Sequence, residues 1–157
     1  MTFKLRSLFW KIIRTNLCLP LDSKIGTNTY FSNRDKIVIG EKFFCGQNCY
    51  FSGNIVIGKR TLIASYVSIV GGDHKIDHCR TEILFTGRDN TKTTIIKDDV
   101  WIGHGAVIMN GVTIGKGAVV GASSVVTKDI PSLAVYVGNP AKFLRYRKIN
   151  ETSSSIS

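Results

Sequence analysis

An apolar residue recurs at every sixth position along most of this chain, and this period restricts the fold more than any other feature of the sequence. The longest unbroken run is Ile96, Ile102, Ile108, Ile114, Val120 and Val126. An upstream run is Ile39, Cys45, Phe51, Ile57, Ile63 and Ile69, with a less regular start at Ile25 and Phe31. A single short repeat cannot bury its apolar side alone, so such repeats must stack. The sequence therefore predicts an all-β solenoid, a parallel β-helix of hexapeptide repeats over residues 25–140.

A second column supports this interpretation. Small or β-branched residues lie four positions after members of the first column: Thr61, Val67, Val100, Ala106, Val112, Ala118 and Ser124. Glycine often occupies the position directly after the apolar residue, as at Gly40, Gly58 and Gly115. We expect both columns to point into the solenoid.

The period is interrupted for a long stretch only once, between Ile69 and Ile96, and we predict a projecting loop over residues 70–95. Long departures from a regular scaffold usually carry function. The segment Gly71-Gly72-Asp73-His74 lies at the start of this loop. We therefore expect the chemistry of the protein to be here.

Both ends of the solenoid are predicted to be helical. Within residues 1–24, a helix over 3–17 has a broad apolar face opposite Lys4, Lys11 and Arg14. It either caps the open end of the solenoid or rests on an anionic membrane, and the two roles are compatible. After the Gly138-Asn139-Pro140 turn, residues 141–157 are predicted to form a short basic helix, Ala141 to Ile149, followed by a disordered tail.

Length and charge limit the remaining classes of protein. A chain of 157 residues is long enough for one domain with its own core, and it contains no apolar run that would span a membrane. Its N-terminus lacks a small-residue cleavage site, so we expect it to remain in the mature protein. The formal net charge of +10 favours an anionic partner: nucleic acid, anionic lipid or a phosphorylated cofactor.

The cysteines do not have the spacing of a metal site. Cys45 and Cys49 fall in the two inward columns, while Cys18 and Cys79 are isolated. We expect Cys45 and Cys49 to be small buried hydrophobic residues in a reducing compartment.

Three segments in the C-terminal half of the chain resemble a known family. They are Asp99-Val100-Trp101-Ile102-Gly103, Val125 to Pro131, and Gly138-Asn139-Pro140-Ala141-Lys142. With them, residues 25–147 resemble the hexapeptide-repeat acyltransferases, most closely the galactoside, maltose and streptogramin acetyltransferases and the capsule and lipopolysaccharide O-acetyltransferases. The resemblance implies a left-handed β-helix, an exception to right-handed crossovers. It also implies a homotrimer with active sites at subunit boundaries and acetyl-CoA in the groove between coils.

The resemblance assigns the catalytic role to His74. In the family, the corresponding histidine lies on the loop that leaves the β-helix. Acyl transfer to a hydroxyl needs a base that takes the proton as the oxygen attacks the thioester, and imidazole titrates near neutral pH. Asp73 or Asp77 would orient the ring by accepting its other N–H, unless a backbone carbonyl does so.

Cofactor-binding residues also follow from the resemblance. Coenzyme A carries a pyrophosphate and a 3′-phosphate, which cations should contact. Gly103 and Ala122 would let the pantetheine arm approach the backbone, Trp101 would cover the thioester, and amides around Gly103 and His104 would stabilise the oxyanion. The implied set is Trp101, Gly103, His104, Ala122, Thr127, Lys128, Lys142 and Arg145, with acetyl-CoA as co-substrate and no metal.

One departure from the family concerns the acceptor. Galactoside acetyltransferases have an acceptor-binding Asn and Asp at positions that hold Phe44 and Ser52 here when the chains are aligned back from His74 without gaps. A galactoside or maltose acceptor is therefore not expected.

The sequence favours an O-acetyltransferase that acts on a sugar hydroxyl in surface polysaccharide or lipopolysaccharide biosynthesis, in the cytoplasm or at the inner face of the membrane. An N-acetyltransferase of a nucleotide-linked amino sugar, or a streptogramin-type antibiotic acetyltransferase, would use much the same residues. The γ-type carbonic anhydrases share the solenoid, but the order of His74, His78 and His104 does not match their zinc ligands. A basic scaffold that binds an anionic membrane or nucleic acid is the non-enzymatic alternative. No nucleic-acid motif is present, so we expect no nucleic-acid partner.

Overall fold

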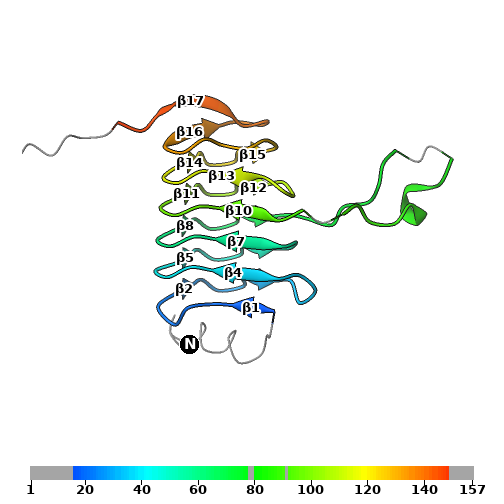
Figure 1. Cartoon of the computed structure of the whole chain (residues 1–157), viewed down its shortest axis with the longest axis horizontal. Coiled ribbons are helices and arrows are strands. Elements are labelled where there is room, and N and C mark those ends of the chain that lie inside the picture. Colours follow the sequence, from blue (N-terminus) through cyan, green and yellow to red (C-terminus); the bar gives the residue numbers. More distant parts are fainter. Residues whose placement is uncertain (1–15, 78–79, 91, 149–157) are drawn as a thin grey trace, which may run out of the picture.

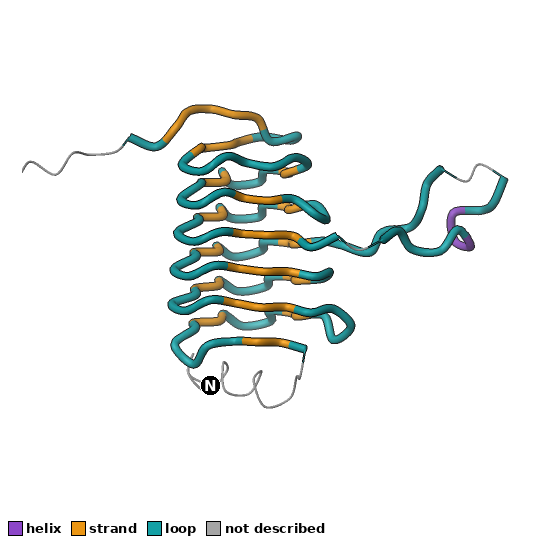
Figure 2. Tube along the Cα trace, viewed as in Figure 1, coloured by secondary structure: helices purple, strands orange, loops and turns teal. Residues whose placement is uncertain are grey.

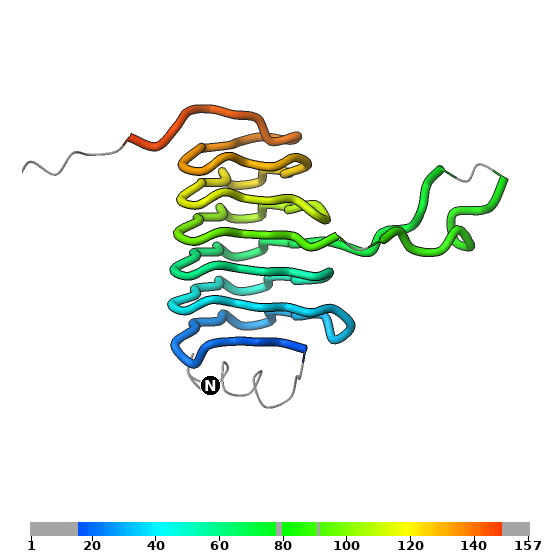
Figure 3. Tube along the Cα trace, viewed as in Figure 1, coloured from blue at the N-terminus to red at the C-terminus, as the bar shows by residue number. Residues whose placement is uncertain are grey.

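The chain coils into a left-handed parallel β-helix, as the hexapeptide period predicts. A computed structural model describes residues 16–77, 80–90 and 92–148. Each complete coil contributes one short strand to each of three parallel sheets, which we call A, B and C (Figure 1). The coils follow one another in sequence order from the N-terminal to the C-terminal end of the stack (Figure 3).

The strands are two to five residues long. Sheet A contains β1 (Leu17–Cys18), β4 (Ile37–Ile39), β7 (Ile55–Ile57), β10 (Thr94–Ile96) and β13 (Thr113–Ile114). Sheet B contains β2 (Lys24–Ile25), β5 (Phe44–Cys45), β8 (Leu62–Ile63), β11 (Trp101–Ile102), β14 (Val119–Val120), β16 (Ala134–Val137) and β17 (Lys142–Tyr146). Sheet C contains β3 (Tyr30–Phe31), β6 (Tyr50–Phe51), β9 (Ser68–Ile69), β12 (Val107–Ile108) and β15 (Val125–Val126).

The interior consists of the two predicted columns. In-register pairing places each inward residue over its counterpart in the next coil, as with Ile39, Ile57 and Ile96 in sheet A. Every member of the six-residue column is at most 3% exposed, and the second column is also buried. The rings of Phe31 and Phe51 stack with centroids 4.9 Å apart. Because burial of such side chains is the main stabilising term, the period itself specifies the core.

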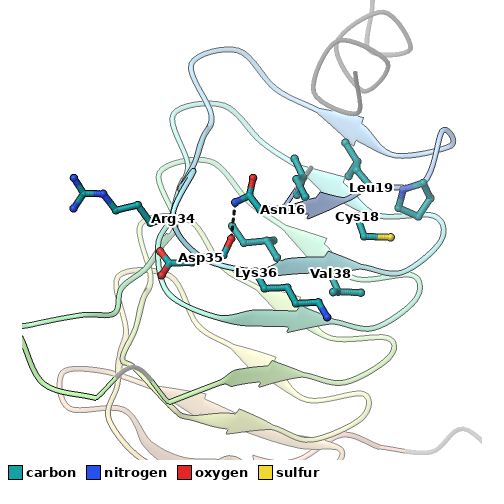
Figure 4. A pocket seen from close by; sticks show the side chains of 10 residues that line it. Asn16, Cys18, Leu19, Arg34, Asp35, Lys36 and Val38 are labelled. Atoms are coloured by element: carbon teal, nitrogen blue, oxygen red, sulfur yellow. Dashed lines mark hydrogen bonds between the residues drawn. The ribbon is translucent and has the colours of Figure 1, made fainter. Parts of the chain in front are cut away.

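The sheets meet at three corners, named AB, BC and CA after the sheets they join. Additional residues leave the solenoid at the CA corner, which connects each strand of sheet C to the next strand of sheet A (Figure 2). One such loop, residues 33–36, explains why Phe31 and Ile39 are eight positions apart rather than six. The Asn16 side chain donates hydrogen bonds to the carbonyls of Ser32 and Asp35 and so holds this loop against the first coil (Figure 4).

The long excursion also leaves at the CA corner, and we call residues 70–93 the arm. Thr94 and Ile95, which we expected in the loop, belong to β10. The arm projects away from the stack (Figure 1). Its two sides run antiparallel: Lys75 N–H donates to Gly87 O (3.1 Å) and Asp89 N–H to Asp73 O (2.7 Å). One 3₁₀ turn, Ile83–Phe85, is the only helical element in the described part of the chain.

The predicted C-terminal helix is wrong. After the turn at Gly138–Pro140, in which the Asn139–Pro140 peptide bond is cis, Lys142–Tyr146 form strand β17, antiparallel to β16. Without β17, strand β16 would present unpaired backbone groups at the edge of sheet B, and the returning strand satisfies them. A nine-residue helix with no apolar surface to cover would be marginal.

The predicted N-terminal helix, residues 3–17, lies outside the described residues except for its last two positions, and Leu17 begins β1. The predicted disordered tail also lies outside, from residue 149 onward. The described part of the chain contains no helix with the length and hydropathy of a membrane span.

Candidate functional site

His74 lies on the arm, close to where the arm leaves the solenoid. It forms an isolated antiparallel bridge with Arg88 on the returning side, and the Arg88 guanidinium donates to Gly72 O (2.8 Å). The imidazole is half-buried, and its Nδ1 atom is buried without a hydrogen-bond partner among the described residues. The predicted role of Asp73 or Asp77 in orienting the ring is therefore not visible here. The ring is left with its Nε2 edge as the side that can face a substrate.

A polar pocket of about 280 Å³ lies beside the base of the arm. Its wall comprises Tyr30, Ser32, Asn33, Arg34, Asp35, Tyr50, Ser52, Gly71, Gly72 and Arg88. Of the two acceptor-aligned positions, Ser52 lines this pocket, whereas Phe44 lies on sheet B. No sequence pattern predicted this pocket, although Tyr30 and Tyr50 occupy equivalent outward positions in paired strands.

The BC corner carries a different group of predicted residues. Gly103 and Gly121 follow paired strands of sheet B, so His104 and Ala122 occupy equivalent positions one coil apart. Gly103 is buried, and a Cβ there would lie 2.6 Å from Ala122 N, so close stacking of the coils already requires glycine. The side chains of His104 and Ala122 are exposed.

The backbone N–H groups of Gly103, His104 and Ala122 differ in whether they already donate a hydrogen bond. Gly103 N–H is committed to Val120 O (2.8 Å), so it is not available to a substrate oxygen. The N–H groups of His104 and Ala122 have no hydrogen-bond partner within residues 16–77, 80–90 and 92–148. The BC corner therefore offers two free amides where the oxyanion-binding group was expected, and His104 rather than Gly103 is the donor near Trp101.

Trp101 and two of the predicted cations lie on sheet B and its upper edge. Trp101 is 50% exposed and is flanked by Leu62 and Val119 in the adjoining strands. Lys142 starts β17 opposite Val137, close to Gly121 at the top of the BC corner. Arg145 pairs with Val135 farther along β17. Both cations are exposed, and neither forms an ion pair with a carboxylate in the described part of the chain. They are therefore available to the phosphates of coenzyme A.

Thr127 and Lys128 lie at the CA corner instead, directly after β15. They share this corner with the arm, whereas Gly103, His104 and Ala122 are at the BC corner, across sheet C. A single chain thus places the predicted base and the predicted thioester contacts at opposite edges of one sheet. The structure does not bring the whole predicted set together within one chain.

Cys45 and Cys49 are buried, as predicted. The Cys49 thiol donates to Ala64 O (3.2 Å). A hydrogen bond between the two thiols, to which burial adds, raises the pKa of Cys45 well above its usual value. The same hydrogen bond lowers the pKa of Cys49. Among the described residues, no group of three His, Cys, Asp or Glu side chains is arranged to hold a metal ion, and His78 lies outside that set.

A larger cavity of about 800 Å³ lies beside the first coil (Figure 4). It is lined by residues 16–20 of the β1 region and residues 34–38 around β4. It contains none of the predicted site residues, so we do not include it in the candidate site.

Comparison with known proteins agrees with this architecture. The family "Bacterial transferase hexapeptide (six repeats)" matches residues 93–128. Galactoside O-acetyltransferase from Escherichia coli is 34% identical over 140 residues, which cover 84% of this chain and 68% of that protein. A relative from Schizosaccharomyces pombe is 37% identical over 128 residues, 80% of this chain and 56% of the relative. The chain therefore spans little more than half of that relative's length.

Two solved structures are similar in fold. A maltose O-acetyltransferase from Clostridium difficile has a TM-score of 0.69 and 35% identity, with 80% of this chain and 68% of that chain covered. A hexapeptide-repeat acetyltransferase from Vibrio cholerae, solved with acetyl coenzyme A, has a TM-score of 0.70 and 29% identity, covering 92% and 78%. The chain belongs to the hexapeptide-repeat acetyltransferase family.

Proposed function

We propose that this chain is an acetyltransferase that moves the acetyl group of acetyl-CoA to a hydroxyl of a sugar. The observation that carries the proposal is the polar pocket at the base of the arm, which Gly72 and Arg88 line, close to His74. The related galactoside and maltose acetyltransferases support the carbohydrate acceptor. The Vibrio cholerae relative with bound acetyl coenzyme A supports the donor.

In the proposed reaction, His74 takes the proton of the acceptor hydroxyl while the hydroxyl oxygen attacks the thioester carbonyl. The new C–O bond forms, the C–S bond breaks, and the coenzyme A thiolate leaves and is protonated by the imidazolium. The free N–H groups at the BC corner, His104 first, stabilise the negative oxygen that develops on the carbonyl. Lys142 and Arg145 hold the phosphates of coenzyme A.

We further propose a homotrimer. The arm with His74 and the BC corner lie at opposite edges of sheet C in one chain, so a complete site requires the BC corner of a neighbouring chain. A rotational arrangement of three chains repeats this contact at each boundary and closes. We propose surface polysaccharide or lipopolysaccharide assembly as the setting, in the cytoplasm or at the inner face of the membrane, and the net charge of +10 supports an anionic environment.

The test is release of free thiol from acetyl-CoA with a panel of sugars, nucleotide-linked amino sugars and a streptogramin. We expect acceptor-dependent release that falls by about 10²–10⁴-fold in His74→Ala, since that is the usual contribution of a general base. Lys75→Ala, an exposed neighbour on the arm, is the matched control and should keep its turnover. Failure to bind coenzyme A, together with no release from any acceptor, would reject the proposal.

A further inference from the structure

The pocket beside the arm combines an aromatic surface with cationic groups. The rings of Tyr30 and Tyr50 stack with centroids 5.1 Å apart and an interplanar angle of 12°, so each ring covers one face of the other and the two form one aromatic stack. Both tyrosines are more than 40% exposed. The exposed edges and outer faces of this stack give the pocket an apolar side that suits a sugar ring, because ligand sites pair apolar area with a few placed polar groups.

The charges of the pocket are unequal. Arg34 and Arg88 carry two positive charges, and Asp35 carries the one negative charge of the lining. The Asp35 carboxylate already accepts a hydrogen bond from Gly53 N–H (2.9 Å), so its role is to hold the corner. Neither arginine forms an ion pair with a carboxylate among the described residues.

Arg34 and Arg88 differ in their side-chain hydrogen bonds. The Arg88 guanidinium donates to Gly72 O, whereas the Arg34 side chain has no hydrogen-bond partner in the described part of the chain. Figure 4 shows Arg34 extending away from the strands of the first coils. The Arg34 guanidinium therefore lies beside the stacked tyrosines without a hydrogen bond among the described residues. A planar guanidinium can donate two parallel hydrogen bonds to the oxygens of one carboxylate or phosphate.

We infer that the acceptor is an acidic sugar, whose ring packs against the Tyr30–Tyr50 stack and whose carboxylate or phosphate is bound by Arg34 with Arg88. This inference rests on the proposed function, because it assigns the pocket beside His74 to the acceptor. The anionic group orients the ring, and a hydroxyl of the same molecule then faces the arm. A neutral sugar would leave both guanidinium groups without an anionic partner, and the Arg34 side chain without any hydrogen bond among the described residues.

The experiment compares matched sugars that differ in one group. Galacturonate and galactose differ by a carboxylate in place of a hydroxymethyl group, and galactose 6-phosphate provides the phosphate arm. Binding to the whole chain is measured by ligand-observed NMR without coenzyme A, and acetyl transfer is measured separately with each sugar. We expect at least one acidic sugar to bind about tenfold or more tightly than galactose, the usual range for a charge-assisted hydrogen bond.

Arg34→Gln should remove this preference and leave the weak binding of galactose unchanged. Lys36→Gln removes the same charge two residues away, at a side chain that lines the larger cavity rather than this pocket, and should keep the preference. Arg88→Gln should also reduce the preference, but its bond to Gly72 makes Arg34→Gln the cleaner variant. Preference for galacturonate or for galactose 6-phosphate identifies which oxyanion the pocket selects.

Equal binding of acidic and neutral sugars, absence of binding by both acidic probes, or a preference that survives in Arg34→Gln would each overturn the inference. These outcomes are separate from failure of the proposed function. Loss of acetyl transfer with retained, Arg34-dependent binding of an acidic sugar would reject the transferase and keep the pocket assignment. Acetyl transfer to galactose alone would do the opposite.

Discussion

At the scale of single residues, the side-chain period of two within each strand separates core from surface. Ile96 is 1% exposed and lies in the inward column, whereas Ile95, the same amino acid in the same strand, points outward beside Val56 and Thr113. The two residues therefore differ in environment but not in chemistry, which makes them a matched pair.

Ile96→Ala should lower the free energy of unfolding by about 2–5 kcal/mol, because it removes buried methyl groups and leaves a cavity. Ile95→Ala should cost well under half as much. Denaturant unfolding followed by circular dichroism measures both. Equal losses would mean that the register of β10 is not the one described here.

The cysteines provide a second prediction at this scale. With native protein, an alkylating reagent should modify exposed Cys18 quickly and leave Cys45 and Cys49 unmodified. Raising the pH to about 9, near the usual thiol range, should not expose Cys45, because its raised pKa keeps the thiol protonated and its burial blocks the reagent. Mass spectrometry after timed alkylation gives the sites. Early modification of Cys45 in folded protein would contradict the burial of its side chain.

At the scale of elements, β17 is held to the solenoid by a few specific contacts. All five of its residues are exposed. The Arg147 guanidinium, just after the strand, donates to Asp99 Oδ2 (3.2 Å) and to Gly117 O (2.9 Å). These bonds connect the C-terminal end of β17 to the AB corners of the two coils beneath β16.

Arg147→Ala should therefore loosen β17 without unfolding the coils. We expect the amides of Lys142–Tyr146 to exchange with solvent several-fold faster, since an exposed ion pair and one hydrogen bond contribute about 1–2 kcal/mol together. Hydrogen exchange measured by mass spectrometry resolves this segment. Lys148→Ala, which removes an exposed charge without a described contact, is the control, and equal acceleration in it would argue against the anchor.

How much the sequence predicts also depends on the element. The coils, their inward residues and the start of the arm follow from the six-residue period, because stacked repeats have the same inward positions in every coil. The segment after Pro140 has no such period, and its basic apolar pattern fits a helix equally well. Its strand state depends on the free edge of β16, which is a tertiary feature that local propensity does not contain.

The candidate site, too, could be predicted from the sequence only in part. The resemblance names His74, Gly103 and Ala122 individually, but it does not state that they lie at different corners. The pocket beside the arm escaped prediction because Arg34 and Arg88 are 54 positions apart in the sequence. Only the common exit of loop 33–36 and the arm at the CA corner brings them together.

At the scale of the whole molecule, the proposed trimer makes two measurable predictions from one cause. Light scattering should give about 52 kDa, three times the 17.3 kDa of one chain. A site shared between chains should also be restored by mixing two inactive variants. We choose His74→Ala, which removes the base, and Ala122→Trp, which fills the BC corner.

Unfolding and refolding the two variants together in equal amounts should restore about a quarter of the wild-type turnover. In random trimers, that is the share of boundaries at which an intact arm meets an intact BC corner. Each variant refolded alone is the control and should remain inactive. No recovery in a mixed sample that contains heterotrimers would place both groups in the same chain and contradict the shared site.

The CA corner also determines where this chain can change length. An insertion within a strand would shift the apolar side chains that follow it out of phase with the coil beneath. Loop 33–36 and the arm add residues without this cost, because β4 and β10 return to the same register on which β1 and β7 lie. This corner is therefore a position at which the protein can acquire a new substrate or a new neighbour while its core stays unchanged.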